Sequence, residues 1–261
     1  MMSSEDQESA VRRLIRGGAG IAGGTVGGAL GFFAGDLGSA AALGTASATV
    51  SELLETLGEE TSKRLLGDRE KQRIGGLLAI ATNNIRDRLE SGESVRSDGF
   101  FERNEFGCSD ADSIAENIIL KAQREPEEKK IVYMGYFFAN VAFNADISAG
   151  LAHQIIKSCE RMTYRQFCLL KIFGVNQIRG TLRDSDYRSE SEFKTERRQV
   201  LYECFDLARS YYIVEESYIL GVTDICPRNV QTQGLGADIF NHMNLSLIPD
   251  EDLLPIVEQL R

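Results

Sequence analysis

The sequence predicts a mainly α-helical protein. A Gly/Ala-rich helical hairpin would come first, then a helical bundle, then a small α+β, winged-helix-like module. Apolar residues recur at three- and four-residue spacing through most of the chain, as amphipathic helices require. The chain has no tryptophan and four prolines, so long uninterrupted helices are possible and an all-β sandwich is disfavoured. We expect the hairpin at 1–66, the bundle at 67–175 and the module at 176–261.

The hairpin is predicted from residues 17–49, which contain one charged side chain, Asp36. Two rows of glycines run through this stretch at four-residue spacing, a pattern typical of closely packed and often membrane-embedded helices. The nine glycines from Gly17 to Gly35 would cost a helix about 9 kcal/mol relative to alanine, so the helix must be held by close packing or by lipid. The candidate residues for membrane contact or self-association are Gly20, Gly23, Gly24, Gly27, Gly28, Gly31 and Gly35. We expect a turn at 35–38 and a second helix over 39–66.

The bundle is predicted from successive amphipathic segments. A helix over 69–91 precedes a polar loop at 91–99, and Ser109 caps the next helix with acidic residues in its first turn. Pro126 suits the first turn of a third helix, which we expect to be the most buried of the protein. A fourth helix starts at 146–148, and Thr163 caps a fifth that ends at Gly174. We expect three phenylalanines to anchor the connection at 100–106: Phe100, Phe101 and Phe106.

The C-terminal module is predicted from a change of pattern after residue 175. Residues 176–198 are polar and expected to be exposed, and a helix follows over 196–209. Two short runs rich in β-branched and aromatic residues, 211–214 and 217–221, predict a β-hairpin. Helices over 234–247 and from Pro249 onward complete a plan of helices around a small hairpin.

Composition bounds the possible partners and the compartment. The net charge is −10 and the pI is about 4.9, so nucleic acid is a disfavoured partner. The five cysteines are widely spaced and form no CxxC pair, which fits a reducing cytoplasm. Arg12 and Arg13 before a Gly-rich run, with Ala46-Ser47-Ala48 further on, loosely resemble an export signal. Asp36 and the acidic residues ahead of the arginines argue against that interpretation.

Motifs for catalysis or cofactor binding are weak. Gly18–Gly23 is a literal GxGxxG, but no buried strand precedes it, as a dinucleotide site requires. His153 and His242, the only histidines, lie on predicted helices without metal-ligand spacing. We therefore expect no enzyme activity, no cofactor and no metal, although a Cys–His pair assembled by the fold remains an alternative. Binding of DNA by the C-terminal module is a further, less favoured alternative.

Residues 129–173 resemble part of the Abi-alpha type of abortive-infection protein of bacteria. The shared pattern is an apolar helix with a small-residue centre, an acidic turn, a helix with paired apolar residues, and a Thr-capped helix at Met162-Thr163-Tyr164-Arg165-Gln166. The run from Leu207 to Phe240 is also similar, whereas the Pro-rich linker of that family is not evident. The resemblance implies a phage-defence role that harms or stalls the host cell, and it carries over no catalytic residue.

We therefore predict a bacterial defence-type effector whose glycine-zipper hairpin engages membrane or self-assembles. Its partners would be membrane lipid or further copies of the chain, and it would be cytoplasmic with association to the inner membrane. The alternative is a soluble helical scaffold or adaptor that uses the hairpin as a protein–protein or oligomer interface.

Overall fold

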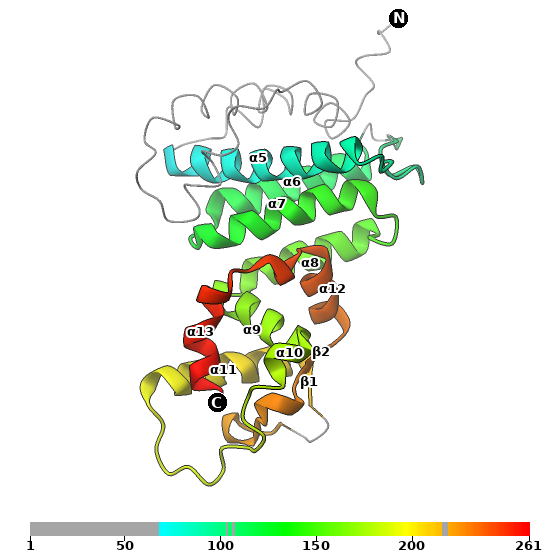
Figure 1. The fold of residues 1–261 in the computed structure, drawn as a ribbon. Coiled ribbons are helices and arrows are strands. Elements are labelled where there is room, and N and C mark those ends of the chain that lie inside the picture. The colour runs from blue at the N-terminus through cyan, green and yellow to red at the C-terminus, as the bar shows by residue number, and fades with distance from the viewer. Residues whose placement is uncertain (1–67, 103, 106–107, 216–218) are drawn as a thin grey trace, which may run out of the picture. The chain divides into compact units, whose positions relative to one another are not determined.

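The computed structural model describes residues 68–102, 104–105, 108–215 and 219–261 (Figure 1). These residues form nine α-helices, three short 3₁₀ helices and one two-stranded sheet, so the predicted mainly helical class is confirmed. The predicted hairpin at 1–66, with all of its glycines, lies outside the described residues. The chain divides into two compact units between Glu160 and Arg161.

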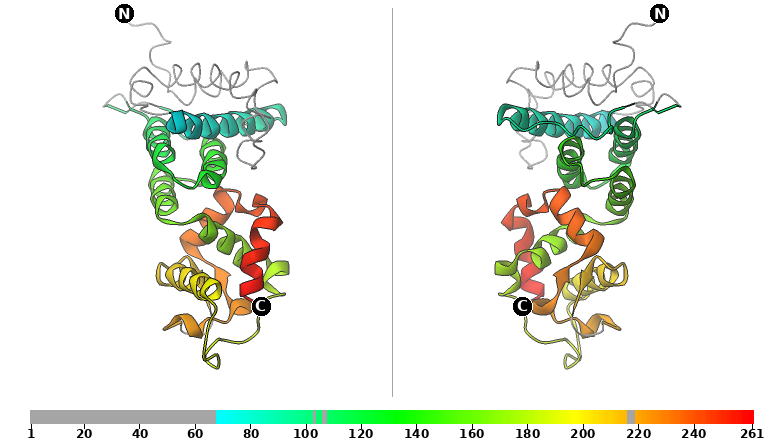
Figure 2. Two further views of the ribbon diagram at one scale, coloured as in Figure 1. Left: turned by 90° about the vertical axis from the view of Figure 1, so that its left-hand side faces the viewer. Right: turned by 90° about the vertical axis from the view of Figure 1, so that its right-hand side faces the viewer.

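The first unit is a bundle built on α5 (Asp68–Glu90). With it lie α6 (Asp110–Arg124), α7 (Glu128–Phe143) and α8 (Ala149–Arg161, whose last residue falls in the second unit). Figures 1 and 2 show α5 lying over α6 and α7, and it packs against both. The helix predicted over 69–91 is therefore confirmed.

The start of α6 is fixed by local chemistry, as predicted. Ser109 Oγ accepts the backbone N–H of Asp112, and the Asp112 carboxylate accepts the backbone N–H of Ser109. This reciprocal pair satisfies N–H groups that the first turn leaves without a helical partner. Phe100 and Phe101 are buried just before it, as expected for anchors, whereas Phe106 lies outside the described residues.

The third predicted helix, α7, buries ten of its sixteen residues, among them Phe137 and Phe138. It begins at Glu128, so Pro126 lies before the helix rather than in its first turn. The position is explained by Glu125, whose carboxylate Oε1 accepts the backbone N–H of Glu127 at 3.0 Å. The Glu125 side chain, which precedes the proline, thus accepts the backbone N–H of the residue just before α7.

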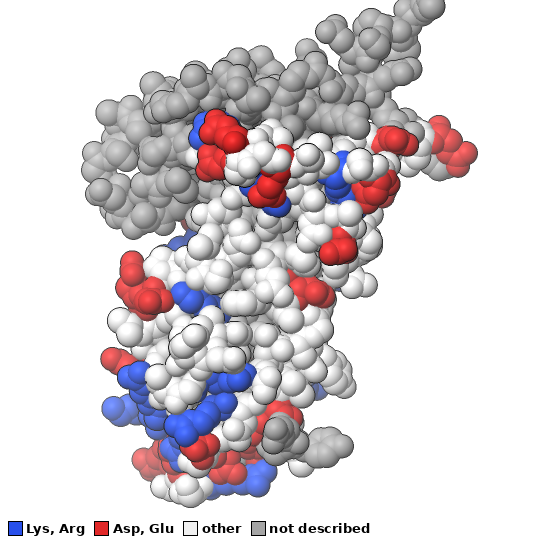
Figure 3. All heavy atoms as spheres, turned by 45° about the vertical axis from the view of Figure 1, so that its right-hand side comes forward, with Lys and Arg blue, Asp and Glu red and all other residues white. Residues whose placement is uncertain are grey.

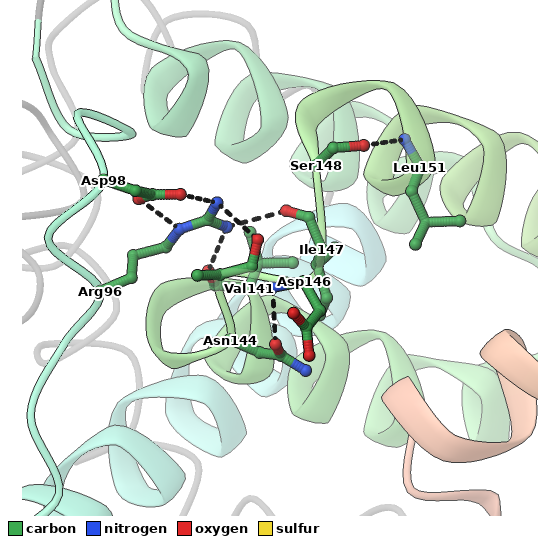
Figure 4. A network of polar contacts seen from close by, with 9 residues as sticks. Arg96, Asp98, Val141, Asn144, Asp146, Ile147, Ser148 and Leu151 are labelled. Atoms are coloured by element: carbon green, nitrogen blue, oxygen red, sulfur yellow. Dashed lines mark hydrogen bonds and ion pairs between the residues drawn. The ribbon is translucent and has the colours of Figure 1, made fainter.

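The connection between α5 and α6 has no regular secondary structure over 93–97, but a buried side chain holds it (Figure 4). Arg96 donates to the backbone carbonyls of Val141 at 3.3 Å and Ile147 at 2.8 Å, where α7 turns into α8. Its guanidinium is also paired in a bidentate manner with Asp98 and lies 4.1 Å from the centre of the Phe100 ring. The polar loop predicted at 91–99 is confirmed, and Arg96 fixes it to the bundle.

The second unit contains α9 (Tyr164–Gly174), α10 (Asn176–Arg179), α11 (Thr195–Arg209), α12 (Gly234–His242) and α13 (Asp250–Gln259). Thr163 and Gln166 form the predicted cap of α9. The compact units place α9 with the C-terminal helices, whereas the sequence grouped it with the bundle. The correction has a physical reason, because α9 packs against α11, α12 and α13.

The predicted β-hairpin between 211–214 and 217–221 is wrong. Strand β1 (Ile213–Val214) pairs antiparallel with β2 (Gln231–Thr232), which is more distant in the sequence. Residues 219–221 form no strand, because the Asp224 carboxylate accepts the backbone N–H groups of Leu220 and Gly221 and folds the segment into a 3₁₀ turn at Val222–Asp224.

Two further predictions in this unit need correction, one about exposure and one about the end of a helix. The polar segment 176–198 is not uniformly exposed, since Leu182 and Tyr187 are buried. The helix predicted over 234–247 ends at His242, because Asn244 adopts a left-handed conformation with φ of 54°. A separate 3₁₀ turn follows at Leu245–Leu247.

Candidate functional site

The seven glycines predicted as the site lie outside the described residues. The first described element after the predicted hairpin is α5. Its residues meet α7 on one side and the core of the first unit on another, and small residues lie on a third.

One face of α5 packs on α7 at a glycine. A Cβ built on Gly135 would lie 2.8 Å from Ile80 Cγ2 and 3.0 Å from the backbone oxygen of Leu77. Further along this face, Arg88 Nη1 donates to Asn140 Oδ1 at 2.8 Å, and its guanidinium lies 4.2 Å from the centre of the Phe143 ring. The close crossing leaves no room between these helices for a ligand.

A second face of α5 forms the core of the first unit. Ile74, Leu78, Ala81 and Ile85 recur at three- and four-residue spacing and are almost completely buried. Arg73 closes one end of the contact, because its Nη1 donates to the backbone oxygen of Gln123 at the end of α6. Ile74, Leu78, Ala81 and Ile85 thus form the apolar side of the amphipathic helix predicted over 69–91.

The remaining face carries small side chains. Gly75, Ala79 and Thr82 follow one another at four- and three-residue spacing, and residues so spaced share one side of a helix. Gly75 is buried, Ala79 is half-buried and Thr82 is 6% exposed. Polar groups border this face, where Arg86 donates to Asn83 Oδ1 at 2.8 Å and pairs with Asp87. We call Gly75, Ala79 and Thr82 the small-residue face of α5.

The small-residue face can bring another backbone close to α5, because it has no bulk to hold that backbone away. Reasoning from sequence missed it, since the amphipathic pattern of α5 drew the apolar residues into one face. The four-residue step from Gly75 to Ala79 was the available signal. It repeats the spacing of the glycine rows upstream.

His153, which the sequence left without a role, forms a cluster with α6. Its Nδ1 lies 2.9 Å from Asn117 Nδ2, and its Nε2 lies 3.4 Å from Ser113 Oγ. When the amide of Asn117 donates to Nδ1, the ring proton is on Nε2 and is directed at Ser113 Oγ. In that tautomer the histidine does not act as a base toward the serine, and the cluster joins α8 to α6.

A buried ion pair lies close to a buried thiol. Lys130 Nζ is 2.6 Å from Glu125 Oε2, and both side chains are almost completely buried. Burial raises the pKa of the Cys159 thiol far above its ordinary value. Lys130 lowers this pKa by a smaller amount, and Glu125 raises it slightly further. The thiol therefore stays protonated and weakly nucleophilic, so this cluster has the character of a structural centre.

In the second unit, cationic and anionic side chains lie side by side (Figure 3). Arg183 and Arg197 both pair with the carboxylate of Glu190 and both lie over the ring of Tyr187. Arg188 pairs with Asp224, and Arg228 with Asp184. Each of these four arginines thus has a nearby carboxylate, which reduces its attraction for an external anion.

Two other features are absent from the described residues. No group of three or more His, Cys, Asp or Glu residues among them is arranged to hold a metal ion. None of the helices in the described ranges is long and apolar enough to cross a membrane.

Comparison of the chain with protein-family models, curated proteins and solved structures found no match. The resemblance to abortive-infection proteins therefore stays a prediction.

Proposed function

We propose that this protein is a bacterial defence-type effector whose Gly/Ala-rich hairpin engages membrane or self-assembles. One observation carries the proposal: seven glycines stand in two four-residue series within a nearly uncharged run of residues 17–49. Such rows suit close helix–helix contact in lipid or between copies of a chain. Their loss would remove the surface on which the activity depends.

The described bundle supports the proposal by giving the hairpin an anchor. The helix α5 is joined directly to the end of the hairpin segment and is fixed to α7 and α6 through Gly135 and Arg73. A weakly hydrophobic hairpin needs such an anchor if it is to remain attached to the protein before it engages a membrane. Association with the inner membrane is part of the same proposal.

The test compares the wild type with the double variant Gly27→Leu/Gly31→Leu. Leucine side chains separate the helix backbones. Under activating conditions, in which the wild type releases a dye from vesicles of phosphatidylethanolamine and phosphatidylglycerol, we therefore expect the variant to release none. Depolarisation of the inner membrane in expressing cells should be lost as well. Gly150→Leu is the matched control, because a Cβ at this position meets nothing closer than 3.9 Å.

Two results together would contradict the membrane proposal. Vesicles would stay intact with wild-type protein under activating conditions, and cells that express it during phage infection would stay polarised. If the double variant released dye as the wild type does, the glycine rows would not be the active surface.

A second candidate function is a scaffold or adaptor, with the hairpin as an oligomer or partner interface and the second unit as a winged-helix-like contact module. The observation that favours it is a set of exposed large side chains in the second unit: Tyr202, Tyr211 and Leu220. Light scattering distinguishes the two functions. A defined oligomer that the same leucine substitutions dissociate, in a protein without effect on vesicles, would support the scaffold.

A further inference from the structure

We propose that the small-residue face of α5 is the docking surface for the glycine rows of residues 17–49 of the same chain. The bundle would then store the hairpin by close backbone contact until a trigger releases it. This inference rests on the proposed function in one respect, because that function identifies the hairpin as the element that must be released.

The shape of the face fits a glycine-rich helix. Gly75 has no side chain and Ala79 has only a methyl group, and the two are four residues apart. A row of glycines on a second helix repeats at the same spacing, so the two backbones can approach over more than one turn. Arg86 lies on the same side of the helix, four residues after Thr82, and it contacts Asn83 and Asp87. It ends the run of small residues, which limits the close contact to about two turns of α5.

Thr82 provides the second, independent observation. It is 6% exposed, and its Oγ1 has no hydrogen-bond partner among the described residues. A buried hydroxyl without a partner is uncommon, and its presence on a strip of small residues points to a polar group that approaches from outside. Backbone carbonyls at a close glycine contact are such groups, and Thr hydroxyls commonly donate to a neighbouring helix in tight helix pairs.

The segment that precedes α5 in the same chain is the best placed occupant of this face. Sixty-seven residues precede α5 and join it directly, so the local concentration of the hairpin at this face exceeds that of any separate partner. Within those residues, 17–49 alone combines two glycine rows with a single charge. A second copy of the chain or an unrelated protein on the face are the alternatives that the experiment separates.

The test is disulfide formation in the full-length protein, in a background with the exposed Cys108→Ser. Cysteine at Ala79 is combined in turn with Gly20→Cys, Gly27→Cys and Ala34→Cys, which lie seven residues apart on the glycine face. A disulfide requires Cα atoms within about 7 Å. We expect an intramolecular bond in at least one pair. It should form about tenfold faster than in the controls, because the tether is the same and only the docked faces bring the Cα atoms within disulfide distance.

Two controls match these pairs. By its spacing from the glycine rows, Thr25→Cys would lie on the opposite face of the predicted hairpin helix. Asp87→Cys replaces Ala79→Cys at an exposed position of α5. Equal rates in pairs and controls would overturn the docking inference. A bond that appears only between two copies of the chain would overturn it in favour of a dimer.

A release variant separates this inference from the proposed function. Ala79→Leu adds bulk to the face and should cause vesicle leakage without a trigger, whereas Asp87→Leu should not. Specific disulfides without leakage in any variant would support docking and contradict the membrane function. Leakage without specific disulfides would support the membrane function and contradict docking. A melting temperature within the range of the wild type shows that Ala79→Leu is folded.

Discussion

Tyr187 illustrates at the residue scale how a polar segment can contain a core residue. Its ring is fully buried within the segment 176–198, under the guanidinium groups of Arg183 and Arg197. Burial raises the pKa of its hydroxyl to about 12, although the two arginines act in the opposite direction. The folded state therefore favours the neutral phenol over the phenolate.

The pH dependence of stability follows from this shift. The folded pKa lies above the ordinary value of 10, so the contribution of Tyr187 is complete below pH 10 and is lost as the pH rises toward 12. We expect Tyr187→Phe to have nearly wild-type stability at pH 8. As the pH rises, the free energy of unfolding should fall less in the variant than in the wild type. The difference should be on the order of 1 kcal/mol at pH 11, where the phenol is ionised in the unfolded chain but not in the folded one.

Urea denaturation at several values between pH 8 and pH 11 measures this difference. The buried thiols Cys159 and Cys204, whose pKa values are also raised by burial, are present in both proteins and affect both curves alike. Curves that stay parallel across this range would contradict the role assigned to Tyr187.

Residues that act on neighbours in sequence were predictable, and those that act across the fold were not. Ser109 and Thr163 were identified as caps because their partners, Asp112 and Gln166, lie three residues away. Arg96 was not identified, since its acceptors lie about fifty residues further along the chain. Tyr187 was missed for the same reason, as the groups that bury it come from several segments.

At the scale of elements, the contact between α5 and α7 depends on the absence of a side chain at Gly135. A Cβ there would lie 2.8 Å from Ile80 and 3.0 Å from a backbone oxygen of α5. The side chain of Ile80 could move, but the backbone oxygen belongs to the helix itself. The two helices would have to separate.

We therefore expect Gly135→Ala to destabilise the protein by about 1–3 kcal/mol through overpacking, although alanine is the better helix former. Gly150→Ala makes the same chemical change on α8, where the nearest atom to a new Cβ is 3.9 Å away. That variant should be neutral or more stable by up to about 1 kcal/mol. Free energies of unfolding in urea provide the comparison, and equal values for the two variants would show that the α5–α7 crossing can adjust.

Helices were predicted better than strands because their signal is local. Periodic apolar residues and caps predict α5, α9 and α11 with boundaries within a residue or two, and they predict the start of α6. The partner of Ile213–Val214 depends on the turn at Tyr211, which has a positive φ of 58°, and on the close approach of Gly236 to the backbone of Tyr212. Neither the positive φ of Tyr211 nor the close approach of Gly236 can be predicted from the β propensities of the residues.

At the scale of the whole molecule, net charge decides which partners are attracted from a distance. The chain carries a net charge of −10, and the arginines of the second unit lie beside carboxylates such as Glu190 and Asp224. Nucleic-acid affinity arises largely from cations that neutralise phosphates. The winged-helix-like arrangement that we propose for this unit would therefore serve contact with protein.

We expect full-length protein to leave the mobility of duplex DNA unchanged at about 50 mM salt, a concentration that favours electrostatic binding. A shift that disappears as salt is added would instead support a regulator that acts through the C-terminal unit. Poly-anionic heparin serves as a control, since equal binding to heparin and DNA would indicate only a non-specific attraction.

The sequence thus predicts the helical class and much of the bundle, whereas the candidate site is predicted only in part. The glycine rows are visible in the sequence because they are periodic. The small-residue face of α5 becomes visible only when the structure shows which sides of the helix α6 and α7 occupy and which hydroxyl lacks a partner.

Arg96 also acts as a cross-link. Its hydrogen bond to the carbonyl of Ile147 joins two segments 51 residues apart in the folded state. Unlike a disulfide, it places no constraint on the unfolded chain. The cysteines in the described ranges are free thiols, so this cross-link depends on no oxidant. The contact that holds the 91–99 loop on the bundle is therefore insensitive to reductants, and it is lost only when the first unit unfolds.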